Sequence, residues 1–277
     1  MRLGDFVPPA AARWVARVRN EKSVGQPRYG SYEEARAAGN TYEDQALVES
    51  VLRKTARRRE QLRLGSIVVD RQMGQNLFVL SWLTRDKSIE VIDLGGAFGN
   101  TFFEANYFLP GKIRSWRVVE TVATTERARQ EFGADVLQFY SETRRAAGGM
   151  INRDLAMALG VFEYTPEPEG ALRDWLALGC RYAYLSRTLI STNMEEVVIT
   201  RQQPMLSQHG PGRLPPGVTD QQTAQVLTIV PEARVRAVIK SSGYRVECEF
   251  DENNFGRRVV EGRRIETKQI GCLLKKV

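Results

Sequence analysis

The sequence has few of the residues on which disulfide, zinc and membrane architectures depend. Its three cysteines, Cys180, Cys248 and Cys272, are far apart and form no C-x-x-C pair. An odd, widely spaced set predicts reduced, buried thiols, not a disulfide framework or a zinc site. No apolar run reaches the roughly 18 to 20 residues of a membrane-spanning helix. We therefore expect a cytoplasmic protein with no transmembrane segment and no bound metal.

Positive charge is abundant, but it is not concentrated as nucleic-acid binding requires. The formal net charge is +7, yet the basic residues are spread along the chain. Their densest groups, such as Arg57-Arg58-Arg59, have no interleaved aromatic residues. This pattern predicts a solvated basic surface and no nucleic-acid partner. It also leaves room for an anionic small-molecule substrate or for attraction to an anionic membrane face.

The first 84 residues have the pattern of helices. The segments Ser31-Tyr32-Glu33-Glu34 and Thr41-Tyr42-Glu43-Asp44 each place a hydroxyl three positions before a carboxylate, which is typical of a helix start. An amphipathic helix is expected after the second segment, another over residues 67–82, and a short one near residues 10–19. Residues 1–84 are therefore predicted to form a helical extension against a domain of residues 85–277.

The stretch Val91-Ile92-Asp93-Leu94-Gly95-Gly96-Ala97-Phe98-Gly99 dominates the interpretation. Strand-type apolar residues lead to a carboxylate, three glycines follow within five positions, and Asn100-Thr101 opens a helical pattern. Glycines permit a sharp turn and close approach of a ligand, and a helix N-terminus offers unpaired N–H groups. The stretch predicts the first strand–turn–helix unit of a nucleotide-binding sheet.

Strand and helix patterns alternate after this loop, which favours a parallel sheet covered on both faces. Strands are expected at residues 89–94, 116–120, 136–140, 154–159, 182–185, 244–250 and 269–274. The last of these is expected to pair antiparallel with its predecessor. Residues 191–228 are rich in proline and glycine and predict a long irregular lid. The predicted fold class is α/β, a doubly wound, seven-stranded, Rossmann-like sheet of the methyltransferase type.

A carboxylate at the end of the second strand supports a nucleotide site. Glu120 follows Gly99 by 21 positions, close to the interval of about 20 residues at which such a group binds ribose hydroxyls. Ala97 stands where a pyrophosphate-binding loop would have its middle glycine. S-adenosylmethionine has no phosphate, so this departure favours it over NAD. Asp93 suits the ammonium group of that donor, and an equal alternative is that Asp93 only fixes the turn.

The residues from Val91 to Gly99, followed by Trp116-x-Val118-Val119-Glu120, resemble those of the class I S-adenosylmethionine-dependent methyltransferases. More narrowly, the chain is similar to a group of bacterial proteins classed as methyltransferases and often found with surface-polysaccharide or secondary-metabolite biosynthesis. The segments that also match are Tyr29 to Ala35, Tyr42, Gly160 to Tyr164, Ser186-Arg187-Thr188 and Thr200 to Pro204. Glu163, Glu167 and Ser186 depart from the group's usual Gln, Asp and Asp.

The resemblance implies S-adenosylmethionine as cofactor, and a sugar or another small polar metabolite as methyl acceptor. The expected cofactor-binding residues are Asp93, Gly95, Gly96, Ala97, Phe98, Gly99, Glu120, Thr121 and Leu159. The expected substrate-binding residues are Tyr164, Arg187, Thr200 and Gln202. Core packing is the alternative role for Phe98, and pairing with a neighbouring acid is the alternative for Arg187.

Methylation of a hydroxyl requires a base near the acceptor. The candidates are His209, the only histidine, and Glu163. An exposed loop position is the alternative for His209, and a helix cap is the alternative for Glu163. Two other functions remain open, an NAD-dependent oxidoreductase or epimerase and a non-catalytic cofactor-binding scaffold. A homodimer is also left open.

Overall fold

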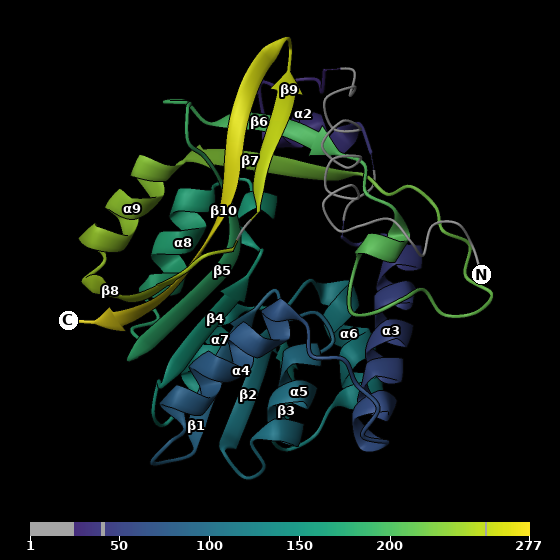
Figure 1. Ribbon diagram of the computed structural model, residues 1–277, viewed down its shortest axis with the longest axis vertical. Coiled ribbons are helices and arrows are strands. Elements are labelled where there is room, and N and C mark those ends of the chain that lie inside the picture. Colours follow the sequence, from purple (N-terminus) through teal and green to yellow (C-terminus); the bar gives the residue numbers. More distant parts are fainter. Residues whose placement is uncertain (1–24, 40–41, 253) are drawn as a thin grey trace.

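The computed structural model of the chain describes residues 25–39, 42–252 and 254–277 (Figure 1). The short helix expected near residues 10–19 and the expected cap Thr41 lie outside these ranges.

In the described part of the chain the sheet has ten strands, not the predicted seven. Seven of them form its continuous path, in the order β3-β2-β1-β4-β5-β10-β8. Strands β1 to β5 are parallel, whereas β10 runs antiparallel between β5 and β8. This arrangement confirms the predicted Rossmann-like sheet and the antiparallel closing pair. The strands of the path are β1 (Ile89–Leu94), β2 (Ile113–Val119), β3 (Leu137–Tyr140), β4 (Leu155–Leu159), β5 (Tyr182–Ser191), β8 (Tyr244–Phe250) and β10 (Arg263–Lys276).

Helices cover both faces of the sheet because successive strand residues point to opposite sides. Val91 joins a core with the helices of one face, and the adjacent Ile92 packs with the other face. The first face carries α3 (Gln45–Arg63), α4 (Arg71–Leu83), α5 (Asn100–Phe108) and α6 (Val122–Phe132). The second carries α7 (Thr143–Gly148), α8 (Pro168–Leu176) and α9 (Glu232–Ser241). The short helix α7 had no clear sequence signal.

The N-terminal helices share the core of the sheet. Leu52 of α3 and Leu80 of α4 belong to the same buried cluster as Val91. The start of α3 differs from the expected capping box, because Asp44 is the N-cap and its carboxylate accepts the Leu47 N–H at 3.1 Å. The first capping pattern does begin a helix, α2 (Tyr32–Ala37), where the Ser31 hydroxyl accepts the Glu34 N–H.

Residues 191–228 are more regular than predicted, which corrects the expected lid. They contain β6 (Val198–Gln202), η3 (Leu206–Gln208) and the start of β7 (Gln225–Pro231), which pairs antiparallel with β6. Every residue of β7 is buried, so its continuous apolar pattern marks a strand despite the prolines nearby. The irregular parts are residues 192–197 and residues 203–224, apart from η3.

The segment between the last two predicted strands is also structured. Residues 251–268 contain β9 (Phe255–Val260) and the first part of β10, which form an antiparallel hairpin. Its many charged side chains suit an exposed two-stranded ribbon. They also obscure the two-residue alternation of apolar and polar side chains by which a strand is predicted. Figure 1 shows this hairpin with β6, β7 and α2 as a layer beyond the carboxyl ends of the parallel strands. No helix in the described ranges is long and apolar enough to cross a membrane.

Candidate functional site

The loop between β1 and α5 turns sharply because three of its residues have positive φ. These are Gly95 (+70°), Ala97 (+49°) and Gly99 (+77°). Glycine tolerates such angles at little cost, whereas alanine rarely adopts them. A Cβ on Gly95 would also lie 2.5 Å from a methyl group of Val161. The Gly95 N–H donates to the Val119 carbonyl at 2.8 Å, which ties the loop to the end of β2.

The carboxylate of Glu120 stabilises this loop from the end of β2. Oε1 accepts the Ala97 N–H at 3.0 Å, and Oε2 accepts the Thr121 N–H at 2.9 Å. Burial raises the pKa of Glu120, and the two N–H donors offset part of that rise. Each carboxylate oxygen has a second lone pair, so Glu120 can still accept hydrogen bonds from a ligand.

Asp93 is buried beneath the loop with one oxygen unsatisfied. Oδ2 accepts the Trp116 indole N–H at 3.0 Å, whereas Oδ1 has no hydrogen-bond partner among the described residues. Burial raises the pKa of Asp93 to about 7; the Trp116 hydrogen bond opposes that rise and the charge of Glu120 adds to it. An orphaned buried oxygen of this kind is stabilised by a ligand that donates a hydrogen bond or carries positive charge.

A cavity of about 890 Å³ lies between the carboxyl ends of the parallel strands and the layer of β6, η3 and the loop after them. Of the residues predicted from the sequence, it is lined by Asp93, Gly95, Gly96, Ala97, Phe98, Glu120, Leu159, Glu163, Tyr164, Arg187, Gln202 and His209. The structure thus brings together residues from both halves of the chain.

Three predicted residues are not among those that line this cavity. Gly99 is the N-cap position of α5, and Thr121 caps α6 by accepting the Thr124 N–H. Thr200 is fully buried and its hydroxyl donates to the Pro27 carbonyl at 2.8 Å. The place expected for Thr200 on the substrate side is therefore corrected to a structural contact with the N-terminal segment.

One wall of the cavity is a neutral hydrogen-bonded network, which we call the amide–tyrosine wall: Tyr42, Tyr164, Gln202, His209 and Gln225. The Gln202 amide donates to the Tyr164 hydroxyl at 3.0 Å and to Gln225 Oε1 at 3.1 Å. The Tyr42 hydroxyl donates to the same oxygen of Gln225 at 3.3 Å. The wall therefore presents hydroxyl, amide and imidazole groups without a formal charge.

His209 reaches the cavity, but its ring is engaged by neutral neighbours. Nε2 lies 2.9 Å from the Thr223 hydroxyl and 3.2 Å from the Gln225 amide nitrogen. Burial and the charge of Lys54 lower the pKa of His209 to about 4. Lys54 also donates to the backbone carbonyls of Ser207, at 2.9 Å, and of His209. At neutral pH His209 is an uncharged, hydrogen-bonded member of the wall.

Glu163 and Arg187 occupy the cavity beyond β4 and β5. Glu163 is 3% exposed, and its Oε2 has no hydrogen-bond partner in the described ranges. Burial raises the pKa of Glu163 to about 7, and the charge of Arg187 acts in the opposite direction. Arg187 has an unusual φ of +56°, and its guanidinium donates to the Leu159 carbonyl at 2.6 Å. Arg187 therefore holds a fixed positive charge near Glu163.

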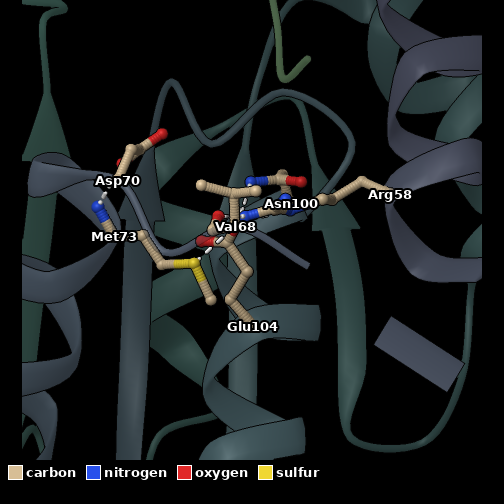
Figure 2. Close-up of polar contacts among 6 residues, drawn as sticks. All are labelled: Arg58, Val68, Asp70, Met73, Asn100 and Glu104. Carbon is tan, nitrogen blue, oxygen red and sulfur yellow. Dashed lines mark hydrogen bonds and ion pairs between the residues drawn. The ribbon is translucent and has the colours of Figure 1, made fainter. Parts of the chain in front are cut away.

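Sequence reasoning missed a polar cluster that lines the cavity beside α5 (Figure 2). Arg58 and Asn100 both donate to Glu104 Oε1 at 3.0 Å. Arg58 also donates to the Val68 carbonyl at 3.3 Å and contacts the Met73 sulfur at 3.0 Å. Arg58 lies within a charged run that resembles a solvated face, and only the packing of α3 on α5 shows that it is buried.

No group of three or more His, Cys, Asp or Glu side chains in residues 25–39, 42–252 and 254–277 is arranged to hold a metal ion. The three cysteines are free, and burial raises the pKa of Cys180 and Cys272 to about 12.

No known sequence family and no curated protein matches the chain. Among solved structures, it is similar to an S-adenosylmethionine-dependent methyltransferase from Clostridium acetobutylicum ATCC 824, with 11% identity over 81% of this chain and 98% of that chain and a TM-score of 0.48. It is also similar to the N-terminal domain of EvdMO1 with SAH bound. The identity is 13% over 76% of this chain and 83% of that chain, and the TM-score is 0.47. A third similar structure is DesVI from Streptomyces venezuelae. The identity is 12% over 74% of this chain and 90% of that chain, and the TM-score is 0.44.

Proposed function

We propose that this protein is an S-adenosylmethionine-dependent methyltransferase that acts on an oxygen or nitrogen of a sugar or another small polar metabolite. The observation that carries the proposal is that three largely buried carboxyl groups, Asp93, Glu120 and Glu163, line one cavity around the glycine loop. Burial raises all three pKa values. Such a site favours a ligand with ammonium and sulfonium charges and disfavours a diphosphate.

The residues around the loop fit this donor. Glu120 has free lone pairs for the ribose hydroxyls, and Asp93 Oδ1 is free for the ammonium group. Gly96 lets the loop pass directly over Asp93, since a Cβ on Gly96 would lie 2.3 Å from the Asp93 carboxylate. When bound, the cofactor supplies an electrophilic methyl group on a sulfonium sulfur.

Glu163 is the proposed base. Its unpartnered Oε2 and its pKa of about 7 allow it to take the proton that an acceptor hydroxyl loses as its oxygen forms the new bond to carbon. The methyl–sulfur bond breaks in the same step, and its electron pair stays on sulfur. His209 suits this role less, because burial and Lys54 lower its pKa to about 4.

The amide–tyrosine wall supports an uncharged, hydroxyl-rich acceptor. Amide and phenol groups both donate and accept hydrogen bonds, and none of the five residues of the wall is ionised near neutral pH when His209 is neutral. Arg58 and Arg187 are the cations among the described residues that line the cavity. Arg58 pairs with Glu104 beside α5, and the Arg187 guanidinium already donates to the Leu159 carbonyl. A neutral sugar ring therefore fits the wall better than an anion does.

An NAD-dependent reaction fits the loop less well. A dinucleotide site presents free backbone N–H groups to a pyrophosphate. Here the Ala97 N–H already donates to Glu120, and the Asp93 carboxylate lies directly beneath the loop. Both features place negative charge where the pyrophosphate would bind.

Calorimetry with S-adenosylhomocysteine, NAD and NADP tests the cofactor. S-adenosylhomocysteine should bind, and NAD and NADP should not. Binding of NAD or NADP without binding of S-adenosylhomocysteine would overturn the proposal. Transfer of a labelled methyl group to a panel of free and nucleotide-linked sugars then tests the activity. The Glu163→Gln variant should keep S-adenosylhomocysteine affinity and lose most of the turnover. Cofactor binding without turnover on any acceptor would favour a non-catalytic binding protein.

A further inference from the structure

A second cavity, of about 240 Å³, lies at the amino ends of β1, β4 and β5, at the edge of the sheet opposite the main cavity. Figure 1 shows these strand starts and the end of α4 on the side away from β6 and β7. The cavity is lined by Trp82, Leu83, Arg85, Asp86, Lys87, Ile89, Asp154, Arg181 and Tyr182. None of these residues lines the main cavity.

Two aromatic rings and Arg181 line this cavity, and Lys275 lies beside one of the rings. The rings of Trp82 and Tyr182 pack edge to face, with centroids 5.5 Å apart. The Arg181 guanidinium lies 5.5 Å from the Tyr182 ring centre, and the Lys275 ammonium lies 5.9 Å from it. Trp82 stays 38% exposed, so part of its indole ring is open to a ligand. The rings thus provide an apolar surface bordered by positive charge.

The carboxylates of this region do not neutralise these cations. Asp154 is buried and already binds the Lys87 ammonium and the Glu90 N–H, the latter at 3.0 Å. In the described part of the chain, no carboxylate lies within ion-pair distance of Arg181 or Lys275. A bound anion would therefore place its charge near cations that have no acidic partner.

We propose that this second cavity binds a small planar-ring anion, a single ring that carries a phosphate or carboxylate group, of the kind found in a pyrimidine nucleoside monophosphate. Trp82 and Tyr182 would contact the ring, and Arg181 would bind the acidic group, with the Lys275 ammonium beside Tyr182 adding positive charge. Arg181 suits this role because a guanidinium matches the geometry of phosphate and carboxylate oxygens. The proposal is independent of the reaction in the main cavity.

Titration of the full-length protein with uridine monophosphate, at low salt and with saturating S-adenosylhomocysteine, tests the site. The chain has four tryptophans, Trp14, Trp82, Trp116 and Trp175. Binding should quench the fluorescence of the wild type but not that of Trp82→Phe, which would assign the signal to Trp82. Uridine monophosphate should bind at least about tenfold more tightly than uridine or inorganic phosphate. Orotate, a ring carboxylate, distinguishes the two kinds of acidic group.

Arg181→Gln should weaken binding at least about tenfold, whereas Arg63→Gln, an exposed change on α3 that lines neither cavity, should leave it unchanged. Added salt should weaken the binding of uridine monophosphate to the wild type, because it screens the attraction between the anion and the cations. Absence of binding, equal affinity for uridine, or wild-type affinity in Arg181→Gln would overturn the proposal. Binding of uridine monophosphate that is seen without S-adenosylhomocysteine and lost in its presence would assign the ligand to the main cavity and would also overturn the proposal.

Discussion

Oε1 of Glu120 accepts the backbone N–H of Ala97 at 3.0 Å. A carboxylate from the end of β2 thereby holds the loop residue that has an unfavourable φ of +49°. The group proposed to bind the ribose is the same group that fixes the loop on which the cofactor would lie. Loss of Glu120 should therefore affect both the loop and the ligand.

Glu120→Ala should weaken S-adenosylhomocysteine binding at least about tenfold, since hydrogen bonds to a charged group contribute roughly 1.5 to 3 kcal/mol. Glu120→Gln keeps an acceptor for the Ala97 N–H but removes the charge, so it should fall between Glu120→Ala and the wild type. Calorimetry measures both. Equal affinity in the wild type and Glu120→Ala would contradict the ribose contact.

Gly95→Ala should destabilise the protein and weaken cofactor binding. Its φ of +70° disfavours any side chain, and its Cβ would lie 2.5 Å from Val161. Gly111→Ala is the matched control, since Gly111 has a φ of +73° and open space around it. The control should lose only about 1 kcal/mol in the free energy of unfolding and keep its cofactor affinity. Urea unfolding and calorimetry separate these effects, and equal losses in both variants would refute a requirement specific to the loop.

The sequence predicted the sheet well because local patterns specify it. Buried strand runs such as residues 89–94 and the loop glycines that follow them are adjacent in the chain, so spacing alone indicates a strand, a turn and a helix. β7 was missed because the prolines and glycines before it dominated the pattern. β9 was missed because its sequence, Phe-Gly-Arg-Arg-Val-Val, has no alternation of apolar and polar residues.

The cavity could be predicted only in part. Asp93 and Glu120 lie at motif positions, whereas Arg58, Gln225 and Tyr42 reach the cavity through packing between segments far apart in the chain. The sequence also does not give the protonation of a group. His209 was a natural candidate base, but its low pKa follows from burial and from Lys54 on a different element.

His209 should stay neutral from about pH 5.5 to 8, because its pKa is about 4 in the folded protein. It is the only histidine in the sequence, so its ring resonances in a tag-free sample can be assigned without ambiguity. An NMR titration should show no change of its Cε1–H shift in this range. A midpoint near its ordinary value of 6.5 would contradict the buried, neutral assignment.

Lys54→Met should release the loop that carries His209. The Lys54 ammonium donates to the carbonyls of Ser207 and His209, and its loss leaves two acceptors without a donor, at a cost of about 1 to 3 kcal/mol. Hydrogen exchange of residues 203–224 should accelerate, and the pKa of His209 should rise because a nearby positive charge is removed. The control Arg53→Met changes an exposed residue on the same helix; similar exchange in the two variants would contradict a role for Lys54 in fixing the loop.

Glu163 should make the protein less stable as the pH rises from about 4.5 to 7. Its pKa is 4.5 ordinarily and about 7 in the folded state, so over this range the folded state binds the proton that the unfolded state has lost. The full effect above pH 7 is roughly 3 kcal/mol. Glu163→Gln should remove it and be more stable than the wild type at pH 8, with little difference at pH 4.5.

Urea unfolding of the wild type and of Glu163→Gln between pH 4.5 and 8 measures the difference in their free energies of unfolding. His209 contributes in the opposite direction, because its lowered pKa reduces stability as the pH falls from 6.5 toward 4. That contribution is common to both proteins and cancels when they are subtracted. A stability difference that does not change with pH would show that Glu163 has an ordinary pKa, and would remove the basis for treating it as the base.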